Sequence, residues 1–156
     1  ESVPEEQDPA RPLSDKGKDT VEKVGVIAAR LGIKPDLIFH SGKLRAKQTA
    51  EILARHLGVS ERVHEKQGLD PLDPVVPVAE WLKDAAKGLS ELAIVGHLPL
   101  LDKLVALLVV KDANLGVVSF QNGAIVKLIP KADEAAYAVQ WVITRQLAEQ
   151  AQTDPR

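Results

Sequence analysis

The chain contains no cysteine and no methionine, and aromatic residues make up only 3% of its 156 positions. Without cysteine there is no disulfide and no thiol nucleophile, and the core has to be built from aliphatic side chains. No apolar run approaches the roughly 18 residues of a membrane-spanning helix, and no secretory signal pattern is seen. Neither sign of charge dominates, since 20 basic residues stand against 22 acidic ones. We therefore expect no nucleic-acid partner, no membrane partner and a cytoplasmic protein.

The length is that of a single domain with a core of its own. We expect one domain over residues 1–149 and a flexible tail over residues 150–156. The chain begins with Glu1 rather than Met. Either it has been processed, or these residues are not the whole translated product.

Hydrophobic periodicity predicts alternating helices and strands. We predict helices over residues 15–31, 44–57, 77–87 and 98–108. We predict strands over residues 37–40, 62–65, 93–95, 117–120, 124–128 and 139–144. Ser14 is a good N-cap for the first helix, and Gly58 is placed to end the second.

This alternation predicts an α/β fold with a mainly parallel sheet, flanked by helices on both faces. The Gln121-Asn122-Gly123 tripeptide predicts a hairpin between strands 117–120 and 124–128, and hence an antiparallel edge.

Two strand-to-helix turns carry the residues of chemical interest. Arg45 follows the first, and His97 lies in the second. Because the carboxyl ends of parallel strands meet at one edge of a sheet, we expect both side chains to lie over one crevice. Arginine offers phosphate oxygens a planar fork of donors, and helix N-termini add backbone donors. Together the turns predict a pocket for a phosphoryl group.

Taken singly, these residues also have structural interpretations. His97 can simply cap a turn, and Arg45 can be a solvated helix residue. Lys43 and Lys47 are expected to be solvated. The remaining histidines are each expected to be structural: His40 as a turn residue, His56 as a solvated helix residue and His64 in an edge strand.

Three segments together resemble a known family. They are RPLSDKG at residues 11–17, SGKLRAKQTA at 41–50 and GHLPL at 96–100. In this order and spacing they resemble the histidine phosphatase superfamily, also called phosphoglycerate mutase-like. They are most similar to its SixA-type phosphohistidine phosphatase branch. The resemblance runs from about Arg11 to Trp141.

The resemblance implies a phosphoglycerate mutase-like fold and a phosphorylated-histidine intermediate. Arg45 matches a family arginine that binds the phosphoryl oxygens, and His97 matches a family histidine that, protonated, donates to the same group. Ser41 matches a family serine beside that arginine helix, where capping the helix explains it equally well. No metal or other cofactor is implied.

The main departure from the family is the nucleophile. In the family it is the histidine of an Arg-His-Gly triplet at the end of the first strand, and the 156 residues contain no such triplet. We expect that the first strand precedes Glu1, that the sheet shows a gap between strands that do not pair, and that Glu1 emerges beside Arg45 and His97. A continuous sheet, with strands 37–40 and 93–95 hydrogen-bonded to each other, would favour a non-catalytic protein.

Two further departures concern the leaving group and the turn before Arg45. Gly42 stands where the family usually has proline. The general acid of larger relatives aligns with Gly68, and Glu65, Asp70 or Asp73 can substitute for it. Lack of an acid suits a P–N substrate, because protonated imidazole leaves readily.

These residues predict a hydrolase that removes phosphate from phosphohistidine in a protein, with the nucleophilic histidine absent from this chain. Two alternatives stay open. One is a broad-specificity phosphatase acting on small phosphate esters, and the other is a non-catalytic protein that binds phosphate or a phosphoprotein.

Overall fold

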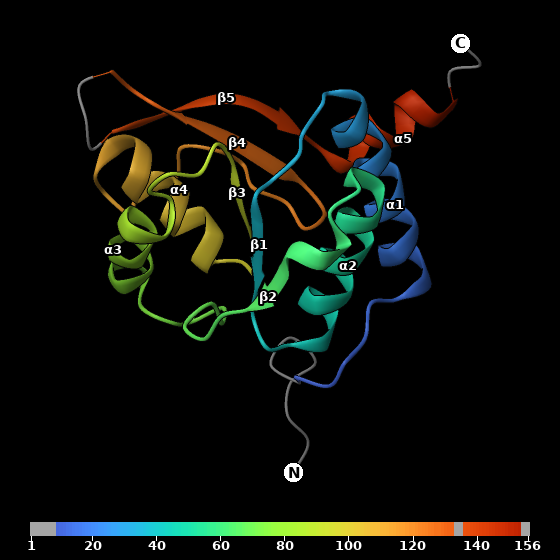
Figure 1. Cartoon of the computed structure of the whole chain (residues 1–156), viewed down its shortest axis with the longest axis horizontal. Helices are drawn as coiled ribbons and strands as arrows, with labels where there is room; N and C mark the ends of the chain where they lie inside the picture. The colour runs from blue at the N-terminus through green and yellow to red at the C-terminus, as the bar shows by residue number, and fades with distance from the viewer. Residues whose placement is uncertain (1–8, 133–135, 154–156) are drawn as a thin grey trace.

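The computed structural model describes residues 9–132 and 136–153. Its helices and strands follow one another along the chain as labelled in Figure 1. They are α1 (Asp15–Arg30), β1 (Leu37–His40), α2 (Leu44–Leu57), η2 (Ser60–Arg62), β2 (Val63–Glu65), α3 (Val75–Ala85), β3 (Leu92–Val95), α4 (Leu100–Val110), β4 (Ile125–Pro130), β5 (Tyr137–Ile143) and α5 (Arg145–Thr153). None of the helices in the described part of the chain is long and apolar enough to span a membrane.

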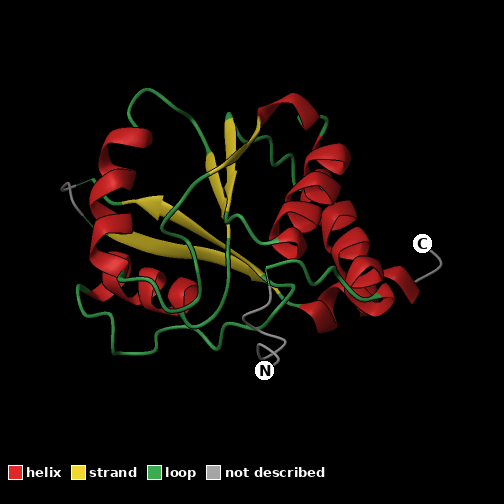
Figure 2. Ribbon diagram, turned by 90° about the horizontal axis from the view of Figure 1, so that it is seen from below, coloured by secondary structure: helices red, strands yellow, loops and turns green. Residues whose placement is uncertain are grey.

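The strands form two sheets. β1 lies at the centre of a three-stranded parallel sheet in the order β2-β1-β3, and β4 pairs with β5 in an antiparallel ribbon. Figure 2 shows the strands between two groups of helices, which are α1, α2 and α5 on one side and α3 and α4 on the other. The predicted α/β class, with parallel strands between helices, is confirmed.

The expected gap in the sheet does not lie between β1 and β3. These strands pair directly, with His40 opposite Val95, because adjacent apolar strands satisfy their backbone groups in one ladder. The sheet is nonetheless not continuous, since within the described residues no ladder joins β3 to β4. The outer edge of β3 is therefore not paired in a sheet, and all four β3 residues are only half-buried. Glu1 lies outside the described residues.

The first half of the chain folds where the sequence predicts. The Ser14 hydroxyl accepts a hydrogen bond from the Gly17 N–H at 3.0 Å, which caps α1. Gly58 ends α2 in the left-handed region at φ 72°, where glycine carries no steric penalty. The helices predicted at 77–87 and 98–108 begin two residues earlier and two residues later, directly after Pro74 and Pro99.

The prediction for the last third is partly wrong. Residues 117–120 form no strand, and their Phe120 N–H donates to the Val118 carbonyl in a local turn. The partner of β4 is β5, across residues 131–136, with a register shift between Lys127 and Leu128. Residues 150–153, the start of the expected tail, belong to α5, which continues to Thr153, and residues 154–156 lie outside the described residues.

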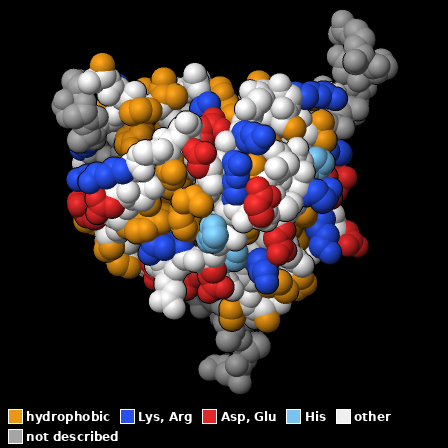
Figure 3. Space-filling model, viewed as in Figure 1, with side chains coloured by type: hydrophobic (Ala, Val, Ile, Leu, Met, Phe, Trp, Pro, Cys, Tyr) orange, Lys and Arg blue, Asp and Glu red, His pale blue; other side chains and the backbone are white. Residues whose placement is uncertain are grey.

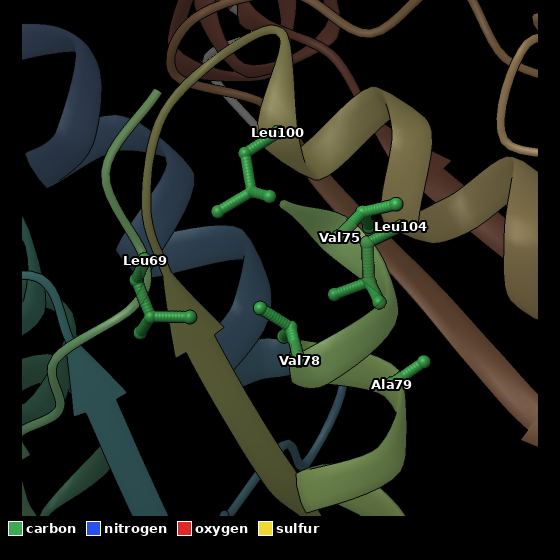
Figure 4. Packing of buried hydrophobic residues seen from close by; sticks show 6 residues of the cluster. All are labelled: Leu69, Val75, Val78, Ala79, Leu100 and Leu104. Carbon is green, nitrogen blue, oxygen red and sulfur yellow. The ribbon is translucent and has the colours of Figure 1, made fainter. Parts of the chain in front are cut away.

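The core is aliphatic and is divided among three clusters. Figure 4 shows the cluster between α3 and α4, where fully buried Leu100 packs close to Leu69 and Val78. A second cluster joins α1 to β5 and α5 through Val24 and Ile143, and a third fixes α2 against β1 through Ile38. Because Leu100 is the first residue of α4, its burial anchors the turn that carries His97.

Candidate active site

Ser41 and His97 meet at the carboxyl ends of β1 and β3. The Ser41 Oγ lies 2.6 Å from His97 Nε2, and Ser41 and His97 are only 1% and 9% exposed. The backbone holds both residues, because the Ser41 N–H donates to the Val95 carbonyl at 3.3 Å and the His97 carbonyl accepts from Leu101. The Ser41 hydroxyl also accepts from the Lys43 N–H at 3.4 Å. The two predicted turns therefore come together at one edge of the sheet.

Positive charge surrounds this pair. Burial, followed by the charges of Arg45 and Lys43, lowers the pKa of His97 to about 4. The charge of Arg45 thus acts on the imidazole, as expected if both residues lie at one edge of the sheet, and their joint role in a site stays a prediction. With a pKa of about 4, His97 is neutral at pH 7. Two nearby cations and burial thus disfavour a positive charge on His97 in the empty site, and its protonation beside a bound phosphoryl group stays a prediction.

Lys43 was expected to be solvated, but its side chain is buried and only 7% exposed. It occupies the N-cap position of α2, one residue after Gly42, at the carboxyl edge of the sheet. Lys47, one helical turn further, is exposed as expected, and Arg45 is half-buried. The pattern of alternating lysines gave no signal that distinguished Lys43 from Lys47.

This arrangement is suited to an anion. A phosphoryl group placed here would meet a hydroxyl, an imidazole and two cations at the start of a helix. Its negative charge would offset the charges that disfavour protonation of His97, and would raise the pKa of that imidazole. The same site does not suit a cation.

The other three histidines lie outside this site. The His40 Nδ1 is 2.6 Å from the Ser41 carbonyl, and the ring is buried, so His40 orders the turn. His56 was expected to be solvated, but it is half-buried and paired with Glu22 of α1, which draws the ring out of the solvent. His64 is exposed, with its ring centroid 6.0 Å from that of Phe39.

A pocket of about 480 Å³ adjoins the Lys43 side of the site. The pocket is lined by Pro9, Gly42, Lys43, Glu65, Lys66, Gln67, Gly68, Asp70 and Asp73. All three carboxylates considered as substitutes for the family acid therefore border it. No group of three or more His, Asp or Glu residues in the described ranges could hold a metal ion. On the face shown in Figure 3, acidic and basic side chains are interspersed, so that face carries no single-sign field.

The chain is similar to known proteins in both sequence and fold. The model of the histidine phosphatase superfamily (branch 1) matches residues 6–73. The serine/threonine-protein phosphatase PGAM5, mitochondrial, of Mus musculus is 34% identical over 80 residues, covering 49% of this chain and 27% of that protein. An uncharacterized protein of Picosynechococcus sp. is 38% identical over 96 residues, covering 60% of this chain and 56% of that protein. The chain thus spans about a quarter to a half of these relatives.

Two solved structures share the fold. The protein histidine phosphatase SixA complexed with tungstate has a TM-score of 0.80 at 23% identity, covering 90% of this chain and 88% of that one. The putative phosphohistidine phosphatase SixA from Agrobacterium tumefaciens has a TM-score of 0.73 at 18% identity, with 92% and 90% covered. The predicted resemblance is thereby confirmed: residues 6–73 carry the sequence pattern of the histidine phosphatase superfamily (branch 1), on a fold shared with SixA proteins.

Proposed function

We propose that this chain provides the phosphoryl-binding part of a phosphatase that hydrolyses phosphohistidine in a protein. The observation that carries the proposal is the buried contact between Ser41 and His97, with Arg45 and Lys43 close enough to lower the pKa of the imidazole. A structural turn needs no such concentration of positive charge. A site that receives a phosphoryl group does.

The reaction we propose has two in-line transfers. A nucleophilic histidine attacks phosphorus as the P–N bond to the substrate imidazole breaks, and water then attacks the phosphoenzyme to release phosphate. Arg45 and Lys43 offset charge on the equatorial oxygens, and the Ser41 hydroxyl and His97 donate hydrogen bonds to them. His97 gains its proton as the phosphoryl group arrives.

The nucleophile has to come from outside the described site, since His40, His56 and His64 occupy other places. We propose that it lies in an Arg-His-Gly triplet on a strand outside the described residues. The edge of β3 that is not paired in a sheet supports this proposal, because an added strand would satisfy its backbone groups. If such a strand paired in parallel with β3, its carboxyl end would lie at the same edge of the sheet as His97.

Two alternatives are each favoured by one observation. The similarity to a serine/threonine-protein phosphatase favours phosphate esters as substrates. Direct pairing of β1 with β3 favours a non-catalytic phosphate-binding protein, because it leaves no slot for a further strand between these two strands. Phosphorylated proteins and small phosphates are thus the expected partners, and the cytoplasm stays the expected compartment.

Single-turnover measurements on the natural full-length protein test the proposal. We expect phosphohistidine in a protein to be consumed faster than a phosphoserine peptide, with a phosphoenzyme that is labile in acid and stable in base. Hydrolysis of esters alone would establish the first alternative. Binding of phosphate without turnover of either substrate would establish the second.

A further inference from the structure

A second, smaller pocket adjoins the pocket beside the proposed phosphoryl site. Its volume is about 130 Å³. The small pocket is lined by Lys66, Gly68, Asp73, Pro74, Pro77 and Val78. Three of these residues, Lys66, Gly68 and Asp73, also line the larger pocket of about 480 Å³, which begins at Gly42 and Lys43. The larger pocket therefore connects the small one to the turn that carries Ser41.

The walls of the small pocket are fixed before any ligand binds. Pro74 is the N-cap of α3 and Pro77 lies in its first turn, where the missing N–H costs no helical hydrogen bond. Val78 is buried in the core cluster with Leu69, as Figure 4 shows. A preformed pocket binds a side chain without first losing the entropy of ordering its walls.

The two charged residues of the lining use their polar atoms elsewhere. The Lys66 Nζ donates to the Gln67 carbonyl at 2.7 Å and lies 5.0 Å from the centroid of the Trp81 ring. The Asp73 Oδ2 accepts the Asp70 N–H at 2.8 Å. The lysine stem, the proline rings and the valine thus leave the small pocket mostly apolar. It is suited to an apolar side chain rather than to a charged group.

Exposed apolar side chains stand next to this pocket in the chain. Leu72, which precedes Asp73, is 75% exposed, and Val76, which precedes Pro77, is 57% exposed. Of the large apolar side chains that the structure describes, Leu72 is the most exposed. Apolar surface of this kind around a pocket is typical of a site that binds another protein. Since a cavity of about 150 Å³ holds a benzene ring, the small pocket has room for one aliphatic side chain.

The larger pocket adds a preference for charge. Its ionisable lining residues are Lys43, Glu65, Lys66, Asp70 and Asp73. Lys66 is held at a backbone carbonyl, and Lys43 is one of the cations whose charge acts on His97. The three carboxylates therefore set the charge that a polypeptide crossing this pocket would meet. A basic residue there would be favoured and an acidic one disfavoured.

We propose that the small pocket holds an aliphatic side chain of the phosphorylated protein, close in sequence to its phosphorylated residue. This inference rests on the proposed function. The phosphorylated side chain enters the site at Ser41 and His97, the substrate backbone crosses the larger pocket beside the carboxylates, and the aliphatic side chain fills the small pocket. Because this contact is the same in the ground state and the transition state, it lowers KM and leaves kcat unchanged.

Phosphohistidine peptides that differ at one position test the pocket in the full-length protein. Each residue on either side of the phosphohistidine is changed in turn from Ala to Leu. We expect Leu at one position to raise kcat/KM by about tenfold through KM, as burial of one aliphatic side chain does. In that peptide, Glu in place of Lys at a position between the two should lower kcat/KM by about fivefold. Phosphoimidazole, which has no neighbouring residues, reports on the phosphoryl site alone.

Three variants locate the effect. Pro77→Ser replaces part of the pocket wall with a hydroxyl at an exposed position, so it should abolish the preference for Leu and leave turnover of phosphoimidazole unchanged. Leu72→Ser changes only the rim and should reduce the preference by less. Leu147→Ser makes the same change at a side chain 56% exposed on α5, across the strands from α3, and should change nothing. Circular dichroism verifies folding.

The outcomes separate this inference from the proposed function. Turnover of the peptides with no preference for Leu, or a preference that persists in Pro77→Ser, would overturn the docking pocket and leave a phosphatase. A dimer that Leu72→Ser dissociates, detected by light scattering, would assign the surface to a second copy and also overturn it. No turnover of any phosphohistidine peptide would overturn the proposed function. The same Leu series on phosphoserine then tests the pocket separately: a preference for Leu supports it, and no preference overturns it.

Discussion

Two histidines, His97 at the edge of the sheet and His56 on the α2 helix, show how differently one residue type can be used. His97 lies buried beside Ser41. Burial lowers the pKa of its imidazole, and so do the charges of Arg45 and Lys43. His56 lies between α1 and α2 and is paired with the carboxylate of Glu22. A histidine with a carboxylate partner fixes two helices to each other. A histidine held among cations has its positive charge disfavoured until an anion arrives, and for this reason we propose that His97 is the functional one.

The contact between α1 and α2 is centred on the carboxylate of Glu22. Glu22 Oε1 pairs with His56, and its Oε2 accepts from Arg55 Nη2 at 2.7 Å. These hydrogen bonds, chiefly the one from His56, lower the pKa of Glu22. Gly25 allows the approach, because a Cβ there would be only 2.7 Å from the imidazole ring. We call Glu22, Gly25, Arg55 and His56 the α1–α2 clamp.

Substitutions in the proposed phosphoryl site and in the α1–α2 clamp should have different effects on turnover. In the full-length protein, Arg45→Ala and His97→Ala should each lower turnover of phosphohistidine by about 10²–10³-fold, the cost of losing one donor to a charged transition state. Glu22→Gln in the α1–α2 clamp should leave turnover unchanged. Steady-state kinetics, with circular dichroism to verify folding, measure both. Turnover at the wild-type rate in Arg45→Ala or His97→Ala would contradict the proposed role of that residue.

The pH dependence of stability should differ between wild type and His97→Gln. The pKa of His97 falls from 6.5 to about 4 on folding, so the unfolded chain binds the proton more tightly. The contribution of neutral His97 is therefore fully present above pH 6.5 and is lost as the pH falls toward 4. After discounting for solvent screening, we expect this loss to lower the free energy of unfolding by about 2 kcal/mol. Urea unfolding at several pH values measures it, and equal pH profiles for the two proteins would contradict the lowered pKa.

Gly25→Ala should weaken the α1–α2 clamp. The added methyl would overlap the His56 ring, and forced repacking of this kind costs about 1–3 kcal/mol, against roughly 1 kcal/mol gained in helix propensity. The expected net loss is about 1 kcal/mol in the free energy of unfolding. In the double variant Gly25→Ala/His56→Ala the overlap is gone, so the methyl should no longer destabilise. A Gly25→Ala protein more stable than wild type would show that the contact is loose.

Glu22→Gln should produce the smallest effect. The Glu22 side chain is 41% exposed, and ion pairs at this degree of exposure contribute about 1 kcal/mol or less. Because folding lowers the pKa of Glu22, its contribution is present above the unfolded pKa and is lost as the pH falls through the folded value. Unfolding curves at low and high salt measure the contribution. If Glu22→Gln lowers stability by the same amount at low and at high salt, the contribution of Glu22 comes from packing rather than from its charge.

The sequence predicts the pocket better than it predicts the end of the chain. Ser41, Arg45 and His97 follow strands whose ends are marked by short apolar runs and by Gly42 and Gly96, so their meeting point follows from parallel pairing. The burial of Lys43 and the position of Glu65 depend on how turns pack against each other, which no local pattern encodes.

The later strands show the limits of local patterns. A turn-forming tripeptide at 121–123 predicts a hairpin, but β4 pairs instead with β5, whose longer apolar face contacts α4 and contributes Ile143 to the core around α1. A gap in the sheet was expected, but β1 and β3, the two strands named in that expectation, pair directly, and within the described residues the sheet ends at β3. The absence of the Arg-His-Gly triplet led us to expect a further strand, but the sequence does not indicate which strand it would pair with.

Titration of the histidine side chains by NMR, with and without inorganic phosphate, tests the central claim most directly. His40, His56 and His64 serve as internal references in the same spectra. We predict that His97 titrates with a pKa of about 4 in the empty protein, that phosphate raises this pKa, and that Arg45→Ala weakens the effect of phosphate. A His97 that titrates near 6.5 and does not respond to phosphate would contradict the phosphoryl pocket.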